Sequence, residues 1–128
     1  MLKAQIRKRL GELSLSIDLS VAKGITVLRG ESGSGKTTIA NLLSGALKPD
    51  EGEIELEGRS VFSTARSINL APEARGIGFV FQTARLLPHL SVEENIRFPQ
   101  TAGRRRPRVD FAEVVEILGL CLLYTSDA

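Results

Sequence analysis

The residues with the clearest chemical potential lie at positions 30–37, which read Gly30-Glu31-Ser32-Gly33-Ser34-Gly35-Lys36-Thr37. Their spacing satisfies the pattern of a phosphate-binding loop. Glycines let the backbone turn where a side chain would block it, so that backbone N–H groups and a helix N-terminus form a cradle for an anion. Lys36 would bring a positive charge to the β and γ phosphates. The hydroxyl of Thr37 would bind Mg²⁺, and Thr38 would donate a hydrogen bond to the α phosphate. The pattern predicts binding of a nucleoside triphosphate, which we take to be ATP with Mg²⁺.

A glycine-rich turn that binds nothing is the alternative interpretation of the same residues. At average residue usage the pattern arises by chance in roughly one chain of this length in several hundred. The context lowers that chance, because a β-rich run precedes the loop and a helical pattern follows it. We therefore favour phosphate binding.

Several strands are predicted around this loop, from period-two alternation of apolar residues or from short β-rich runs. They span residues 2–7, 12–18, 24–29, 53–57 and 77–81. Gly11 lies near the turn between the first two, which are half-buried. The run that leads into the phosphate loop is predicted to be more deeply buried.

Helices are predicted between these strands. Apolar residues at helical spacing indicate a helix over 37–47, which the proline and glycine of residues 48–52 end. Ser91-Val92-Glu93-Glu94 has the form of a capping box that opens a helix through Phe98, and Asp110 marks another helix start. Residues 63–75 show no clear period and are predicted to be a loop. The mixture indicates an α/β fold.

Composition sets limits on the class of protein. A chain of 128 residues suits one domain, and its net charge of +2 does not by itself indicate nucleic acid. Its single cysteine, Cys121, forms neither an internal disulfide nor a zinc site, which favours a reducing compartment. The sequence shows neither a secretory signal nor an apolar run of about 18 residues. Arg104, Arg105, Arg106 and Arg108 cluster as a solvated surface segment or as the site of an anionic partner.

The sequence resembles the nucleotide-binding subunit of an ATP-binding-cassette (ABC) transporter. The likeness is carried by residues 28–38, by residues 43–54 with Gly58, and by residues 77–82 with 86–96. It implies a phosphate-loop NTPase core of the ABC type with an N-terminal antiparallel β subdomain. It also implies that Gln82 contacts Mg²⁺ and the attacking water, and so belongs with Lys36 to the catalytic residues.

Within that family the sequence is most similar to molybdate importers, through residues 71–82 and 84–89. The resemblance implies ATP hydrolysis that powers import of molybdate or a similar oxyanion, without contact between this subunit and the solute. It implies two partners, a transmembrane permease subunit that meets the region from Gln82 to Ile96 and a second nucleotide-binding subunit. It places the protein peripherally on the cytoplasmic face of the inner membrane.

The likeness covers residues 1–120 and fails for the tail, 121–128. The family's serine-glycine-glycine signature, catalytic glutamate and switch histidine have no match, and His89 is expected to be an ordinary loop residue. We therefore expect the N-terminal part of a cassette that binds ATP but does not turn it over, with an incomplete sheet and uncovered apolar surface. Residues 8–13 also lack the aromatic side chain on which the family often stacks adenine, so the preference for ATP over GTP stays open.

Two other functions remain open. One is a non-catalytic nucleotide-binding fragment. The other is a soluble cassette ATPase that acts on DNA or ribosomes, which only the arginine cluster at 104–108 supports. Salt-sensitive binding of nucleic acid would favour the latter.

Overall fold

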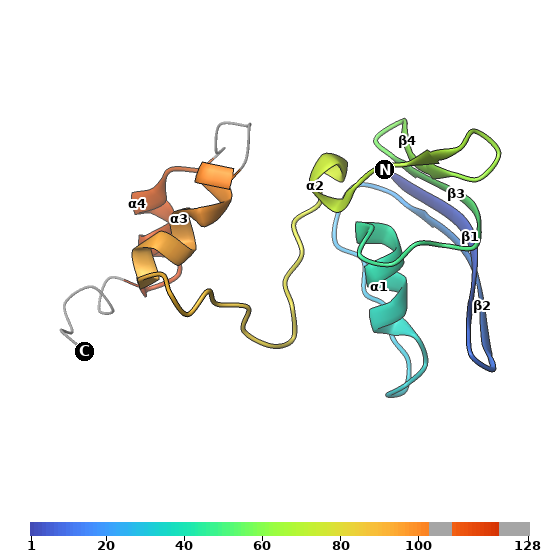
Figure 1. The fold of residues 1–128 in the computed structure, drawn as a ribbon, viewed down its shortest axis with the longest axis horizontal. Helices are drawn as coiled ribbons and strands as arrows, with labels where there is room; N and C mark the ends of the chain where they lie inside the picture. The colour runs from blue at the N-terminus through green and yellow to red at the C-terminus, as the bar shows by residue number, and fades with distance from the viewer. Residues whose placement is uncertain (103–108, 121–128) are drawn as a thin grey trace. The chain divides into compact units, whose positions relative to one another are not determined.

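The computed structural model describes residues 1–102 and 109–120, which belong to two compact units, Met1–Val80 and Phe81–Ala128. Figure 1 follows the chain through both units. The first unit holds a sheet, the helix that follows the phosphate loop and one short further helix; the described part of the second unit holds two helices. The arginine cluster at 104–108 and the tail 121–128 lie outside the described residues.

The first unit is built on a five-stranded antiparallel sheet with strand order β2-β1-β3-β4-β5. The strands are β1 Leu2–Leu10, β2 Leu13–Val21, β3 Glu51–Leu56, β4 Arg59–Ser63 and β5 Ile68–Asn69. The first two form the predicted hairpin, each longer than predicted, around Gly11 at φ +57°. Their alternation places Ala4 opposite Leu19 on the buried face, as period-two patterning requires.

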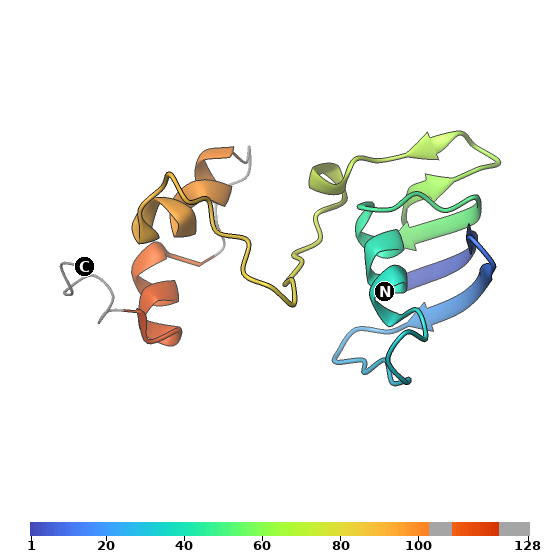
Figure 2. The same cartoon turned by 60° about the horizontal axis from the view of Figure 1, so that its bottom comes forward.

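Helix α1, Lys36–Ser44, lies across the apolar face of this sheet (Figure 2). Its Leu42 is fully buried, and burial of a leucine side chain stabilises a fold by about 1.5–3 kcal/mol. The buried core consists of Ala4, Ile6, Leu42, Ile54, Val61 and Phe62. The helix ends earlier than the predicted Leu47, because Gly45 adopts the left-handed conformation, φ +89°, that commonly terminates helices.

Strand β3 pairs with β1, and the two backbones lie very close together at Gly52, which is opposite Ile6. A Cβ atom at this position would lie 2.0 Å from the backbone oxygen of Gln5 and 2.7 Å from Cα of Ile6. Gly52 also has φ +118°, which L side chains rarely adopt. Only glycine fits this position in the ladder.

A buried arginine joins α1 to a later part of the chain. Arg75 is 6% exposed, and its Nη1 donates to the carbonyl oxygens of Leu42 at 3.2 Å and Leu43 at 2.9 Å. Its Nε donates to the Leu70 carbonyl at 2.9 Å, and its Nη2 to Oδ1 of Asn69 at 3.1 Å. Burial lowers the pKa of Arg75, but an arginine retains its charge. The guanidinium therefore caps carbonyls near the C-terminal end of α1.

The predicted loop over 63–75 is wrong in part. It contains β5 and the short helix α2, Pro72–Arg75, and β4 just before it was not predicted. These elements are short, and their strands are defined by pairing with β3 and β4 rather than by a long alternating pattern.

The predicted strands over 24–29 and 77–81 are also wrong, because neither segment is a strand in the structure. A strand requires a neighbour to exchange backbone hydrogen bonds, and within the described residues nothing pairs with either segment. Ile25 is consequently 97% exposed and Val80 96% exposed. The expected uncovered apolar surface is thereby confirmed for these residues.

In the second unit, helix α3, Val92–Ala102, begins at the predicted capping box. The Glu94 N–H donates to Oγ of Ser91 at 3.2 Å, and the Ser91 N–H donates to Oε2 of Glu94 at 2.7 Å. The bond from the Ser91 backbone N–H, followed by a hydrogen bond from the Ser91 side chain, lowers the pKa of the Glu94 carboxyl group. The helix passes the predicted end at Phe98, since the φ of Pro99 fits a helix although the ring removes one N–H donor.

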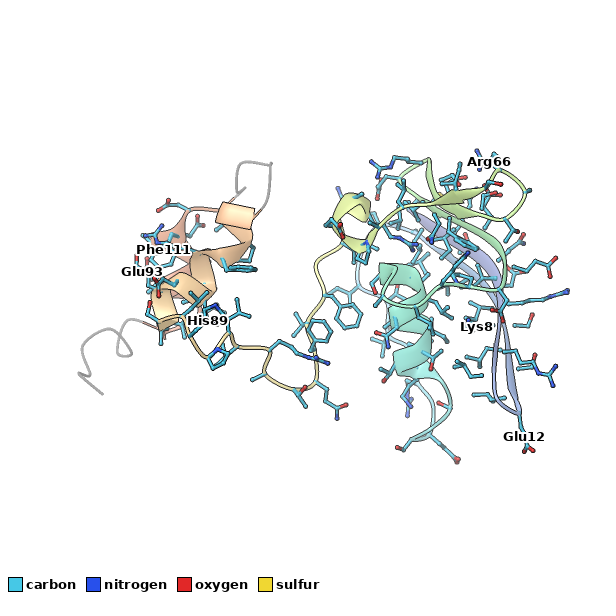
Figure 3. All side chains as sticks on the ribbon, in the orientation of Figure 1. Lys8, Glu12, Arg66, His89, Glu93 and Phe111 are labelled. Carbon is cyan, nitrogen blue, oxygen red and sulfur yellow. The ribbon has the colours of Figure 1, made fainter. Side chains whose placement is uncertain are left out.

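Helix α4, Phe111–Ile117, begins at the predicted Asp110, whose Oδ2 accepts from the Ala112 N–H at 3.2 Å. An arginine on α3 connects the two helices. Arg97 Nε donates to Oε1 of Glu93 at 2.7 Å, and its guanidinium carbon lies 3.7 Å from the centre of the Phe111 ring. Figure 3 labels Glu93 on α3 and Phe111 on α4, the two residues that Arg97 contacts.

An ion pair near the start of β3 yields a testable pH dependence. Asp50 accepts from the Arg9 N–H at 2.8 Å and from Lys8 Nζ at 2.9 Å, and these contacts, the backbone bond first, lower its pKa. A carboxylate whose pKa is lowered by folding stabilises the fold above its unfolded pKa, roughly 4, and this contribution is lost as the pH falls through the folded value. We expect acidification from pH 7 to 3 to reduce the free energy of unfolding more in the wild type than in Asp50→Asn, as measured by urea titration.

Glu12→Gln is the matched control for that experiment. Glu12 lies at the exposed tip of the β1–β2 hairpin, and no hydrogen bond or ion pair joins it to Lys8 within the described residues (Figure 3). The wild type and Glu12→Gln should lose stability in parallel on acidification. An Asp50→Asn curve that followed them would show that Asp50 contributes nothing to the pH dependence.

Candidate functional site

The phosphate loop connects the extended segment after β2 to the first turn of α1. Two of its glycines adopt positive φ, Gly33 at +80° and Gly35 at +97°, and Gly35 is the N-cap of α1. The Ser34 N–H donates to the Glu31 carbonyl at 3.2 Å, which closes a turn within the loop. The backbone therefore takes the tight path for which the sequence places glycines.

The first and last glycines of the motif lie close to neighbouring side chains. A Cβ atom at Gly30 would lie 2.6 Å from Oγ of Ser34, and one at Gly35 would lie 3.1 Å from Cδ2 of Leu15. The first glycine of the motif thus leaves room for the loop to fold over itself. Gly35 allows the start of α1 to approach β2.

The start of α1 presents backbone donors. The first helical bond runs from the Ile39 N–H to the Gly35 carbonyl at 2.9 Å. The N–H groups of Lys36, Thr37 and Thr38 precede it and have no acceptor in the part of the chain that the structure describes. No acidic residue lies in the first turn. Unpaired donors and the positive end of the helix dipole together attract an anion.

Lys36 folds back over the loop and supplies the positive charge of the site. Its Nζ donates to the Gly30 carbonyl at 2.7 Å, to the Glu31 carbonyl and to Oγ of Ser34 at 3.2 Å. All of these acceptors are neutral. Phosphate oxygens would form stronger, charge-assisted bonds with the same ammonium group, so the lysine is placed to exchange one set for the other.

The hydroxyl groups fit a Mg²⁺ ion that is held mainly by phosphates. Thr37 is exposed on the first turn of α1, and its hydroxyl makes no hydrogen bond within the described residues; Thr38 is half-buried. Glu31 and Ser32 are exposed on the loop. The described residues include no cluster of three or more His, Cys, Asp or Glu that could hold a metal by itself. Mg²⁺ in nucleotide sites takes only one or two protein ligands and keeps several waters, so a single hydroxyl is compatible with it.

The structure thus brings residues 30–38 together in one loop. Gln82 is exposed and belongs to the second unit, three residues before Arg85, whose guanidinium carbon lies 4.6 Å from the centre of the Phe81 ring. A site shared by Lys36 and Gln82 therefore stays a prediction.

Sequence reasoning missed one side chain in the segment that follows Gln82. Asn95 on α3 forms four hydrogen bonds with the backbone of the preceding loop. Its position four residues after the helix cap Ser91 is the signal that could have found it, because asparagine near a helix start often bonds to local backbone.

Residues 14–125 match the family model described as "ABC transporter". The chain belongs to the ABC transporter family. That match includes the phosphate loop, Gln82 and both helices of the second unit, and so agrees with the resemblance found from sequence.

Individual relatives with curated descriptions show which ABC proteins the chain is similar to. The chain is 46% identical over 123 residues to a protein of Paramagnetospirillum magneticum described as "Molybdenum import ATP-binding protein ModC", covering 94% of this chain and 33% of that protein. It is 47% identical over 117 residues to the protein of the same description from Vibrio cholerae, covering 91% of this chain and 31% of the relative. This ABC chain thus spans about a third of the length of the curated relatives that it matches.

A solved cassette has the same fold. The chain aligns with a dimeric ATP-binding cassette in a post-hydrolysis state, bound to ADP and Pi, with a TM-score of 0.65 and 28% identity. The alignment covers 96% of this chain and 56% of the cassette. In this ABC chain, none of the described helices is long and apolar enough to cross a membrane.

Proposed function

We propose that this chain binds ATP with Mg²⁺ through residues 30–38 and forms part of the ATPase subunit of a molybdate or related oxyanion importer. The observation that carries the proposal is the start of α1, where free backbone donors lie beside Lys36. The identity to molybdenum import proteins supports the solute class.

Each residue of the loop has a defined role in this proposal. The N–H groups at the start of α1 bind phosphate oxygens, and Lys36 neutralises charge on the β and γ phosphates. The Thr37 hydroxyl would hold Mg²⁺, which would supply positive charge against the phosphates. In the complete enzyme, Gln82 would be a second ligand of Mg²⁺ and would orient the attacking water.

Turnover requires more than these residues. Phosphoryl transfer depends on positioning and charge neutralisation, and also on a group that orients or deprotonates water. The sequence matches neither the family's catalytic glutamate nor its signature. The proposal is therefore that this chain by itself binds ATP without hydrolysing it, and that the complete enzyme is a dimer of nucleotide-binding subunits.

The proposal places the protein on the cytoplasmic face of the inner membrane through a permease subunit. The region from Gln82 to Ile96 would meet that subunit. Leu86 in this region is 72% exposed, and Phe81 just before it is 46% exposed. Exposed apolar side chains of this kind suit a contact with another protein.

Equilibrium binding by calorimetry tests the nucleotide site. We expect MgATP to bind at least about a hundredfold more tightly than AMP, because the proposal assigns every donor to a phosphate and none to the base, and each charge-assisted bond to a phosphate adds roughly tenfold. Phosphate release is measured on the same sample and should be absent. Equal affinity for ATP and AMP would refute the phosphate-loop assignment, and sustained phosphate release would refute the claim that this chain does not turn over.

A further inference from the structure

The loop between residues 87 and 91 is tied to α3 by one half-buried side chain, Asn95. Its Oδ1 accepts from the Leu87 N–H at 2.8 Å. Its Nδ2 donates to the carbonyls of Leu87 at 3.1 Å, Leu90 at 3.1 Å and Ser91 at 2.9 Å. A further backbone bond, from the Leu90 N–H to the Leu87 carbonyl at 3.1 Å, closes the turn itself.

These contacts require an asparagine. The side chain needs one acceptor and an NH₂ group on the same short stem, since its two hydrogens are shared among three carbonyls. Aspartate keeps the acceptor but places a negative charge beside three carbonyl oxygens. Alanine removes both functions. The conformation of the loop therefore depends on both the oxygen and the NH₂ group of the Asn95 side chain.

We infer that Asn95 is a positioning residue that holds residues 87–91 in the shape that a permease subunit recognises. The inference rests on the proposed function, in which residues 82–96 form the contact with the permease. The loop lies at the centre of that region, and its Pro88 and His89 are exposed while Asn95 faces the loop's backbone. Figure 3 shows the labelled His89 at this loop.

A preformed loop increases affinity because its backbone is ordered before the partner arrives. Each residue that must be ordered on docking reduces affinity by roughly tenfold. Asn95 fixes both ends of the turn, at Leu87 and at Ser91, and so removes this cost for the whole segment. Loss of the amide should weaken docking by roughly ten- to a hundredfold.

The first experiment measures the loop itself. In Asn95→Ala, the backbone amide of Leu87 should exchange with solvent roughly tenfold faster than in the wild type, since it loses its acceptor. Asn95→Asp keeps that acceptor, so the Leu87 amide should stay more protected than in Asn95→Ala. The control Glu93→Gln, two residues away on the same helix and paired with Arg97, should leave Leu87 exchange unchanged. The affinity for MgATP and the far-ultraviolet circular dichroism should not change in any variant, as a general loss of structure would alter both.

The second experiment measures docking, with inner-membrane vesicles from the organism that carries the gene and protein-free liposomes of the same lipids as the probes. We expect Asn95→Ala to bind the vesicles at least tenfold more weakly than the wild type and Glu93→Gln, and none of them to bind the liposomes. Unchanged Leu87 exchange in Asn95→Ala, or unchanged vesicle binding despite faster exchange, would overturn the inference. Failure of the wild type to bind vesicles while Leu87 exchange responds would instead overturn the proposed permease contact.

Discussion

Replacing Lys36 with alanine is expected to reduce the affinity for MgATP by at least a hundredfold. In the structure the Lys36 ammonium is free to exchange two backbone carbonyls and a hydroxyl for phosphate oxygens. A hydrogen bond between charged groups contributes about 1.5–3 kcal/mol, so loss of two such bonds removes roughly two to four powers of ten. Calorimetric titration of the two proteins with MgATP measures the difference.

Lys23→Ala is the matched control for that loss. Lys23 lies on the exposed segment between β2 and the phosphate loop and carries the same charge. Its removal should change the affinity less than threefold if Lys36 acts by direct contact rather than through the overall field. Similar losses from both variants would show that general electrostatics, not the loop geometry, attracts the nucleotide.

Replacing Gly52 with alanine is expected to unfold the first unit or to lower its free energy of unfolding by several kcal/mol. The new Cβ would fall 2.0 Å from the Gln5 carbonyl oxygen, and both contacts nearest to it are backbone atoms that the sheet holds in place. Overpacking of this kind costs about 1–3 kcal/mol, and the positive φ adds about 1–2 kcal/mol. Small domains have only about 5–15 kcal/mol in total. Urea unfolding followed by circular dichroism measures the change.

Gly58→Ala separates the cost of the steric overlap from the cost of the positive φ. Gly58 follows the same strand, β3, and also has positive φ, +76°, but a Cβ atom there meets nothing within 4 Å. It should therefore show the conformational cost alone. Equal destabilisation by the two substitutions would contradict the close backbone approach of β3 and β1 at Gly52.

Short sequence patterns correctly predicted the hairpin and the helix starts, which are determined by residues near one another in the chain. The hairpin around Gly11 follows from alternation, and the starts of α3 and α4 follow from Ser91 and Asp110. Each of these signals involves bonds between residues close in sequence. The structure confirms the existence of these elements, and differs from the predicted bounds by a few residues.

The predictions of strands failed where strand formation depends on pairing with residues distant in sequence. Residues 24–29 and 77–81 have the composition of strands, but composition cannot show whether a neighbouring strand is present, and the described residues provide none. Conversely, β5 is a strand of two residues, Ile68–Asn69, that exists only because β4 lies beside it. No window of sequence contains that information.

Among the functional and supporting residues too, those that depend on local sequence were predictable and those that depend on more distant contacts were not. The phosphate loop was predictable because its residues are consecutive and each type has a chemical reason. Asn95 was missed because it bonds to Leu87, 8 residues earlier, and Arg75 because it bonds to Leu42, 33 residues earlier. A role for Gln82 beside Lys36 depends on how two separate units meet, which no local pattern specifies.

Arg75 also sets an order of events during synthesis. Within the described residues, the carbonyls of Leu42 and Leu43 receive donors from Arg75, which is translated 32 to 33 positions later. At about 5–20 residues per second, the ribosome takes roughly 2–7 seconds to supply it. Until then these two carbonyls near the end of α1 lack the donors that Arg75 supplies, so the nascent chain completes these contacts of α1 only after the hairpin, β3 and β4 have been made.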